Sequence, residues 1–152
     1  MKIVIVTGMS GSGKTVALKM FEDFGYYCVD NLPVELISNF VELTVDSERG
    51  MKGAALGIDI RSGLNGLDKV IDELRHKKIN MEILFLEADD ETLIKRYKET
   101  RRSHPLATDG RLIDGIHLER QRLAFLRAGA DRILDTGRFL TKELKQELKE
   151  IY

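Results

Sequence analysis

The sequence has few of the residues that disulfides, zinc centres and membrane spans require. Among 152 residues there are one cysteine and three histidines, which are too few and too scattered for an intramolecular disulfide or a zinc site. Apolar runs stay well short of the roughly 20 residues that span a bilayer, and the N-terminus has a strand pattern instead of a signal peptide. We therefore expect a cytoplasmic protein with no membrane segment.

Neither sign of charge is in excess. The chain has 24 basic and 25 acidic side chains, for a formal net charge of −1, so charge as a whole does not direct it to nucleic acid or to an anionic membrane. Its 43% apolar and 32% charged residues are ordinary for a globular protein, and its length fits one domain. We expect a single domain over residues 1–152.

Apolar runs that suit strands alternate along the chain with segments of helical periodicity. The expected strands are residues 2–7, 26–29, 54–60, 82–86 and 132–134, and the helical patterns cover residues 14–24, 36–43, 67–74, 90–101, 112–126 and 140–151. Strands separated by helices predict a parallel sheet that is covered on both faces, an α/β fold.

A glycine-rich segment separates the first expected strand from the first helix. It reads GMSGSGKT and satisfies G-x-x-x-x-G-K-[ST] in the strand-to-helix context that gives this motif its meaning. The predicted phosphate-binding residues are Gly8, Met9, Ser10, Gly11, Ser12, Gly13, Lys14 and Thr15. Backbone N–H groups would surround phosphate oxygens, Lys14 would reach the β- and γ-phosphates, and Thr15 would present its hydroxyl to Mg²⁺. A flexible Gly/Ser turn is the alternative.

Two aspartates, Asp30 and Asp59, stand at the ends of expected strands. Ligands of open parallel sheets gather at the carboxyl ends of the strands. Either carboxylate could hold a metal-bound water or position the attacking group, and either could instead cap the turn that follows it. We place Thr15 and Asp59 first as the metal-binding pair.

Cations gather near the end of the fourth expected helix and in the loop beyond it. They are Lys95, Arg96, Lys98, Arg101, Arg102 and His104. Such a segment could be a lid over the triphosphate, with Arg101 and Arg102 offsetting transition-state charge, or a solvated basic face. Residues 135–137 could line the nucleotide base or form a simple turn. Cys28 is expected to be a small buried side chain.

Four segments together resemble the RapZ/YvcJ family of bacterial nucleotide-binding proteins. They are GMSGSGKT, GYYCVDNLP at residues 25–33, DIR at 59–61 and TRRSHPL at 100–106. The resemblance covers most of the chain and implies a P-loop NTPase fold with strand order 2-3-1-4-5, ATPase and GTPase activity, and a guanine-nucleotide segment. By that resemblance the guanine-nucleotide segment consists of Asp59, Ile60, Arg61 and Ser62.

Chains of the family that it resembles are longer, and in the RNase-adapter branch their C-terminal half binds an amino-sugar phosphate and RNA. An RNA or protein partner therefore belongs to the full-length family and is not carried over to this chain alone. We expect a regulatory hydrolase that uses ATP, GTP and Mg²⁺. The predicted catalytic residues are Lys14, Asp59, Asp30, Arg101 and Arg102. A small-molecule kinase that uses the same P-loop, and a nucleotide-sensing module that docks another protein without turnover, are the alternatives.

Overall fold

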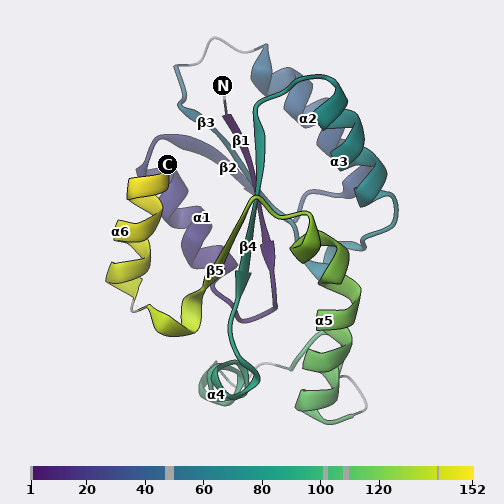
Figure 1. The fold of residues 1–152 in the computed structure, drawn as a ribbon, viewed down its shortest axis with the longest axis vertical. Helices are drawn as coiled ribbons and strands as arrows, with labels where there is room; N and C mark the ends of the chain where they lie inside the picture. Colours follow the sequence, from purple (N-terminus) through teal and green to yellow (C-terminus); the bar gives the residue numbers. More distant parts are fainter. Residues whose placement is uncertain (1, 47–49, 101–102, 108–109, 140) are drawn as a thin grey trace.

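The computed structural model describes residues 2–46, 50–100, 103–107, 110–139 and 141–152. Strands and helices alternate along the chain as the sequence predicts (Figure 1). The strands are β1 (Lys2–Gly8), β2 (Tyr26–Asp30), β3 (Gly53–Gly57), β4 (Met81–Glu87) and β5 (Arg132–Asp135). The α-helices are α1 (Lys14–Asp23), α2 (Val34–Val45), α3 (Leu67–His76), α4 (Asp90–Thr100), α5 (Leu112–Ala128) and α6 (Thr141–Ile151). Two short 3₁₀ helices are labelled η1 (Ile60–Ser62) and η2 (Thr136–Arg138).

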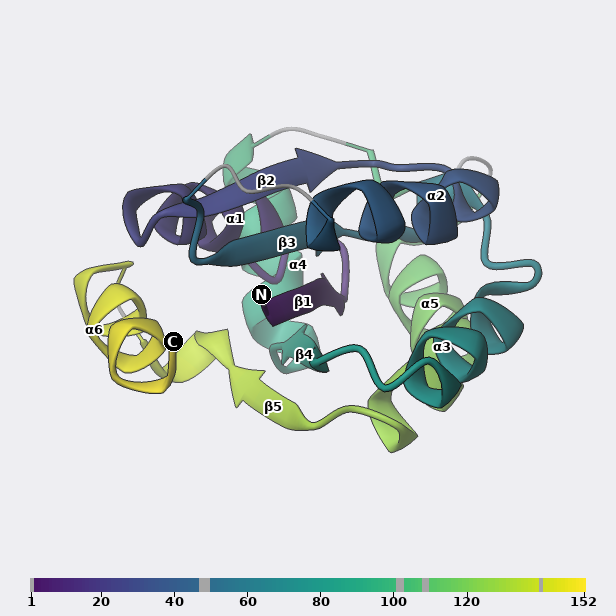
Figure 2. The same cartoon turned by 90° about the horizontal axis from the view of Figure 1, so that it is seen from above.

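The described strands form one parallel sheet in the order β2-β3-β1-β4-β5. This order confirms the P-loop fold that was expected. Helices α2, α3 and α5 cover one face of the sheet, and α1 and α6 cover the other (Figures 1 and 2). Because all the strands run the same way, their carboxyl ends meet at one edge, and the loops that follow them can share a site.

The central strand β1 explains why the chain forms three layers. Ile3 and Ile5 pack into the core beneath α2, α3 and α5, whereas Val4 and Val6 pack into the core beneath α1 and α6. All four side chains are fully buried. A strand that is apolar at every position suits the middle of a sheet covered on both faces.

The expected strand at residues 54–60 is longer than the observed one, because β3 ends at Gly57. The Oδ1 atom of Asp59 accepts a hydrogen bond from the backbone N–H of Arg61, at 3.0 Å. This side-chain cap starts η1 and turns the backbone away from the sheet. Asp59 therefore lies in the loop beyond the strand, whereas Asp30 is the last residue of β2.

No helix in the described ranges is long and apolar enough to cross a bilayer.

Candidate functional site

The loop between β1 and α1 depends on glycine at both ends. Gly8 has φ 140°, and a Cβ atom there would overlap the carbonyl oxygen of Leu86 and lie 2.8 Å from its carbonyl carbon. Gly13 has φ 102° and precedes the first residue of α1. These left-handed conformations favour residues without a Cβ atom. They bring the loop over the carboxyl edge of the sheet and leave the first N–H groups of α1 facing out of the helix, where they can bind an anion.

A cavity of about 400 Å³ opens in front of this loop. Its walls come from several parts of the chain, some of which lie far apart in the sequence. They include residues 10–16 of the loop and α1, Asp59 and Arg61 after β3, Arg96 and Tyr97 of α4, Ser103 and Pro105, and Thr136 of η2. The structure thus places the predicted Lys14, Thr15, Asp59 and Arg61 around one space.

Lys14 is buried at this cavity, with 9% of its surface exposed. Its Nζ atom donates hydrogen bonds to the carbonyl oxygens of Gly8 at 3.2 Å and Met9 at 3.0 Å. The Oδ2 atom of Asp59 lies 3.9 Å from the same nitrogen. Burial lowers the pKa of Lys14, and the negative charge of Asp59 opposes that shift. The loop therefore holds a lysine side chain, with an acidic neighbour, at the start of α1.

The two candidate aspartates lie in different surroundings. Asp59 is 8% exposed, and its Oδ2 atom lies 3.4 Å from Nη2 of Arg61. Asp30 is exposed and packs against Gly57, where a Cβ atom would lie 2.5 Å from its Oδ1 atom. In the described part of the chain, Asp59 is among the cavity residues and Asp30 is not. Asp59, and not Asp30, thus lines the same cavity as Thr15.

The rest of the predicted guanine-nucleotide segment is divided between core and surface. Ile60 is buried in the core beneath α2, α3 and α5. Arg61 exposes 60% of its side chain at the mouth of the cavity. Ser62 is the last residue of η1. The structure therefore places the side chain of Arg61 where a ligand could meet it.

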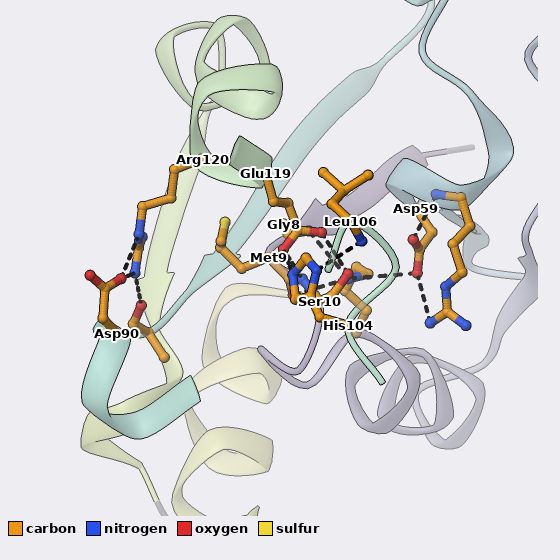
Figure 3. A network of polar contacts seen from close by, with 12 residues as sticks. Gly8, Met9, Ser10, Asp59, Asp90, His104, Leu106, Glu119 and Arg120 are labelled. Atoms are coloured by element: carbon orange, nitrogen blue, oxygen red, sulfur yellow. Dashed lines mark hydrogen bonds and ion pairs between the residues drawn. The ribbon is translucent and has the colours of Figure 1, made fainter. Parts of the chain in front are cut away.

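Behind the loop, a buried carboxylate collects three hydrogen bonds (Figure 3). Oε1 of Glu119 accepts from the backbone N–H of Ser10 at 2.9 Å, and Oε2 accepts from the Ser10 hydroxyl at 2.5 Å. The Nε2 atom of His104 lies 3.2 Å from Oε1. Since Nδ1 of His104 accepts from the N–H of Leu106 at 3.0 Å, Nε2 carries the proton and donates to Glu119. Both Ser10 donors therefore point to α5.

Arg96 connects the loop to η2. Its Nη1 atom donates to the carbonyl oxygen of Gly11 at 2.9 Å and to Oγ1 of Thr136 at 3.1 Å, and Nη2 donates to the Thr136 carbonyl at 3.1 Å. The Thr136 hydroxyl in turn donates to the carbonyl of Ser12 at 2.7 Å. Residues 135–137 form the turn that was weighed above, because Oδ1 of Asp135 accepts from Gly137 N. Thr136 also lines the cavity.

The expected lid is described only in part. Arg101 and Arg102 lie outside the described residues, so their predicted role stays a prediction. His104 was expected to belong to the same lid, but it is 2% exposed and hydrogen bonds to Glu119. Its buried ring therefore anchors segment 103–107 to α5 and is not among the residues that line the cavity.

Glu119 is absent from the sequence-based predictions, although a signal for it exists. The buried residues of α5 include Ile116, Glu119, Leu123 and Leu126, which recur at helical spacing. An acidic residue on the apolar face of a helix needs buried hydrogen-bond donors. That pattern identifies Glu119 as unusual but does not reveal its partner, Ser10, which lies 109 residues away.

The donors and acceptors of the cavity suit a triphosphate with a hard cation. Ser12 is fully buried, and among the described residues its hydroxyl has no hydrogen-bond partner. No group of three or more His, Cys, Asp or Glu side chains that could hold a metal occurs in the described ranges. A cation here would depend on oxygen atoms of Thr15, Asp59 and the ligand itself, which is how Mg²⁺ commonly binds beside phosphates.

Comparison with known sequences identifies the family. The sequence matches the RapZ-like N-terminal domain over residues 1–152. The chain belongs to this family. Relatives of this RapZ-like domain include the nucleotide-binding proteins of Agathobacter rectalis, 51% identical, and Lachnoclostridium phytofermentans, 53% identical, each over 154 residues. The alignments cover 100% of the chain and 53% and 54% of those two proteins, so the RapZ-like domain spans about half the length of the curated relatives it matches.

Solved structures that resemble the RapZ-like domain include small-molecule kinases. The shikimate kinase of Bacteroides thetaiotaomicron superposes with a TM-score of 0.67 at 15% identity, over 99% of this chain and 97% of the kinase. The gluconokinase of Sinorhizobium meliloti superposes with a TM-score of 0.60 at 18% identity, over 97% of this chain and 90% of the kinase. At these identities the likeness establishes a shared fold and no activity. The RapZ-like domain therefore has a P-loop fold, with the motif GMSGSGKT between β1 and α1.

Proposed function

We propose that this RapZ-like domain binds ATP or GTP together with Mg²⁺ along its P-loop and hydrolyses the terminal phosphoanhydride bond. The observation that carries the proposal is the position of Lys14, whose buried ammonium lies beneath the glycine loop and within 3.9 Å of Asp59. The RapZ/YvcJ resemblance supports ATP and GTP as substrates and a regulatory role for the reaction.

The P-loop would bind the phosphates through charge and preorganisation. The N–H groups at the start of α1 meet the phosphate oxygens, and Lys14 exchanges its carbonyl partners for the β- and γ-phosphates. Because these donors are held before the substrate arrives, they stabilise the charge of the transition state without reorganising at the moment of reaction.

Thr15 and Asp59 would serve the metal side of the site. When bound, Mg²⁺ supplies charge neutralisation at the phosphate oxygens. Thr15 would present its hydroxyl to the ion, and the carboxylate of Asp59 would hold a metal-bound water or orient the attacking water. The 3.4 Å contact between Asp59 and Arg61 keeps that carboxylate at the cavity wall.

Phosphoryl transfer to a small hydroxyl acceptor is the second candidate function. It is favoured by the kinase fold and by the cavity wall beyond Asp59, where Arg61 exposes a guanidinium that could hold an anionic acceptor. Phosphate release from ATP or GTP without an acceptor would support hydrolysis. Turnover that begins only when a metabolite is added would support the kinase.

The decisive experiment compares Lys14→Ala with a matched lysine on the same helix. Lys19 is exposed on α1, so Lys19→Ala controls for losing one positive charge. We expect Lys14→Ala to lower the rate of phosphate release by about 10²- to 10³-fold and Lys19→Ala to leave it unchanged, with both variants folded by circular dichroism. Parental turnover in a folded Lys14→Ala protein would overturn the proposal.

A further inference from the structure

We infer that Glu119 is a positioning residue for nucleotide binding, which sets the conformation of the P-loop through Ser10 and couples it through His104 to segment 103–107. The inference rests on nucleotide binding at the P-loop, which is part of the proposed function, and does not depend on hydrolysis.

The first step of the argument is the number of donors that Glu119 collects. Its side chain is 0% exposed and receives hydrogen bonds from Ser10 N, Ser10 Oγ and His104 Nε2. An ionised carboxylate offers only acceptors, so three converging donors match that state and offset its burial. The neighbouring Arg120 does not neutralise it, because that guanidinium faces the other way and binds Asp90 and the Ala88 carbonyl (Figure 3).

The second step is the place of Ser10 in the loop. Ser10 follows Gly8 and Met9, whose carbonyl oxygens hold the Lys14 ammonium. It precedes Gly11, whose carbonyl accepts from Arg96. By holding both donors of Ser10, Glu119 determines the direction of the backbone between these two contacts. The negative charge of Glu119 also opposes the lowering of the Lys14 pKa by burial, although less than that of Asp59.

The third step is the connection to the wall of the cavity. His104 is buried against Tyr97, with ring centroids 5.3 Å apart, and Ser103 and Pro105 on either side of it line the cavity. Gly115 of α5 makes room for this segment, because a Cβ atom there would lie 2.7 Å from Cβ of Ala107 and 2.9 Å from Nδ1 of His104. Glu119 thus links two walls of the cavity from behind without lining it.

The test measures the affinity of the whole chain for fluorescent N-methylanthraniloyl derivatives of ATP and GTP with MgCl₂. We expect Glu119→Gln to weaken binding by about 10-fold or more, because an amide has one acceptor oxygen and cannot satisfy all three donors. Arg120→Gln, the adjacent residue on α5, should bind as the parental chain does. A double-mutant cycle with Ser10→Ala should show strong non-additivity, since both changes remove the same contact.

Gly115→Ala gives a second route if Glu119→Gln does not fold. It should displace His104 without changing a cavity residue, and nucleotide affinity should fall although alanine favours the helix. The inference is wrong if Glu119→Gln folds and binds the nucleotides with parental affinity. It is also wrong if Glu119→Gln does not fold and both Ser10→Ala and Gly115→Ala bind the nucleotides with parental affinity. If the parental chain itself binds neither nucleotide, the proposed function fails as well, so the two failures are distinguishable.

Discussion

Replacing Gly8 by alanine tests whether the close approach of the P-loop to β4 is required by the fold. The added Cβ atom would overlap the carbonyl oxygen of Leu86 and lie 2.8 Å from the Leu86 carbonyl carbon. Both are backbone atoms of the paired strand β4, so they cannot rotate aside as a flexible side chain would. Relief therefore requires moving the loop or the sheet.

Two terms contribute to the expected loss of stability. A side chain in the left-handed region, where Gly8 has φ 140°, costs on the order of 1–3 kcal/mol. Overpacking against a fixed neighbour costs about 1–3 kcal/mol more. We therefore expect the free energy of unfolding to fall by roughly 2–6 kcal/mol, the sum of the two ranges.

Two other glycines separate these terms. Gly13 has φ 102°, but no atom of the described residues lies within 4 Å of its added Cβ atom, so Gly13→Ala should show the conformational term alone. Gly129 has φ −93°, and a Cβ atom there would lie 3.5 Å from the carbonyl oxygen of Phe125, an ordinary contact, so Gly129→Ala should change stability by less than about 0.5 kcal/mol. Urea unfolding followed by circular dichroism suits a chain without tryptophan. Equal losses for Gly8→Ala and Gly13→Ala would refute the steric argument.

Three further predictions concern the metal, the lid and the thiol. EDTA should abolish turnover and excess MgCl₂ restore it, because Thr15 and Asp59 offer oxygen ligands; activity that survives chelation contradicts this. Replacing Arg101 and Arg102 together by alanine should lower turnover more than the urea midpoint, and parental rates with ATP and GTP would rule out the lid. Cys28 should react slowly with iodoacetamide at pH 8 until the chain is unfolded. Burial raises the pKa of its thiol to about 12, and the thiolate is the form that reacts. Equal reaction rates in the folded and unfolded chain would count against that burial.

The fold was predictable because its signals are local and repeated. Each strand and helix has its own apolar pattern, and the P-loop motif together with the family resemblance supplied the strand order. Strand ends were less predictable, since pairing and caps decide them. The apolar run through Ile60 suggested a longer strand, but β3 ends at Gly57, and the hydrogen bond from Arg61 N to Asp59 begins η1.

The site was predictable where its residues are neighbours in the sequence. The spacing from Gly8 to Thr15 is a local pattern. Asp59 was expected near it from its place at the end of a strand, and the structure places it 3.9 Å from Lys14. The contacts of Ser10 with Glu119 and of Arg96 with Gly11 span 109 and 85 residues. A helical pattern shows which face of α4 or α5 is buried, but it does not name the atoms opposite that face.

The hydrogen bonds of Arg96 join the P-loop to η2, so the two segments are expected to move together. One guanidinium binds Gly11 and Thr136, and Thr136 itself binds Ser12, so a displacement of the loop on one side of the cavity is transmitted to the turn on the other. Arg138, in the same turn, has a side chain that is 83% exposed. A fluorophore attached at position 138 would therefore sense events at the phosphate loop while leaving the cavity wall chemically intact.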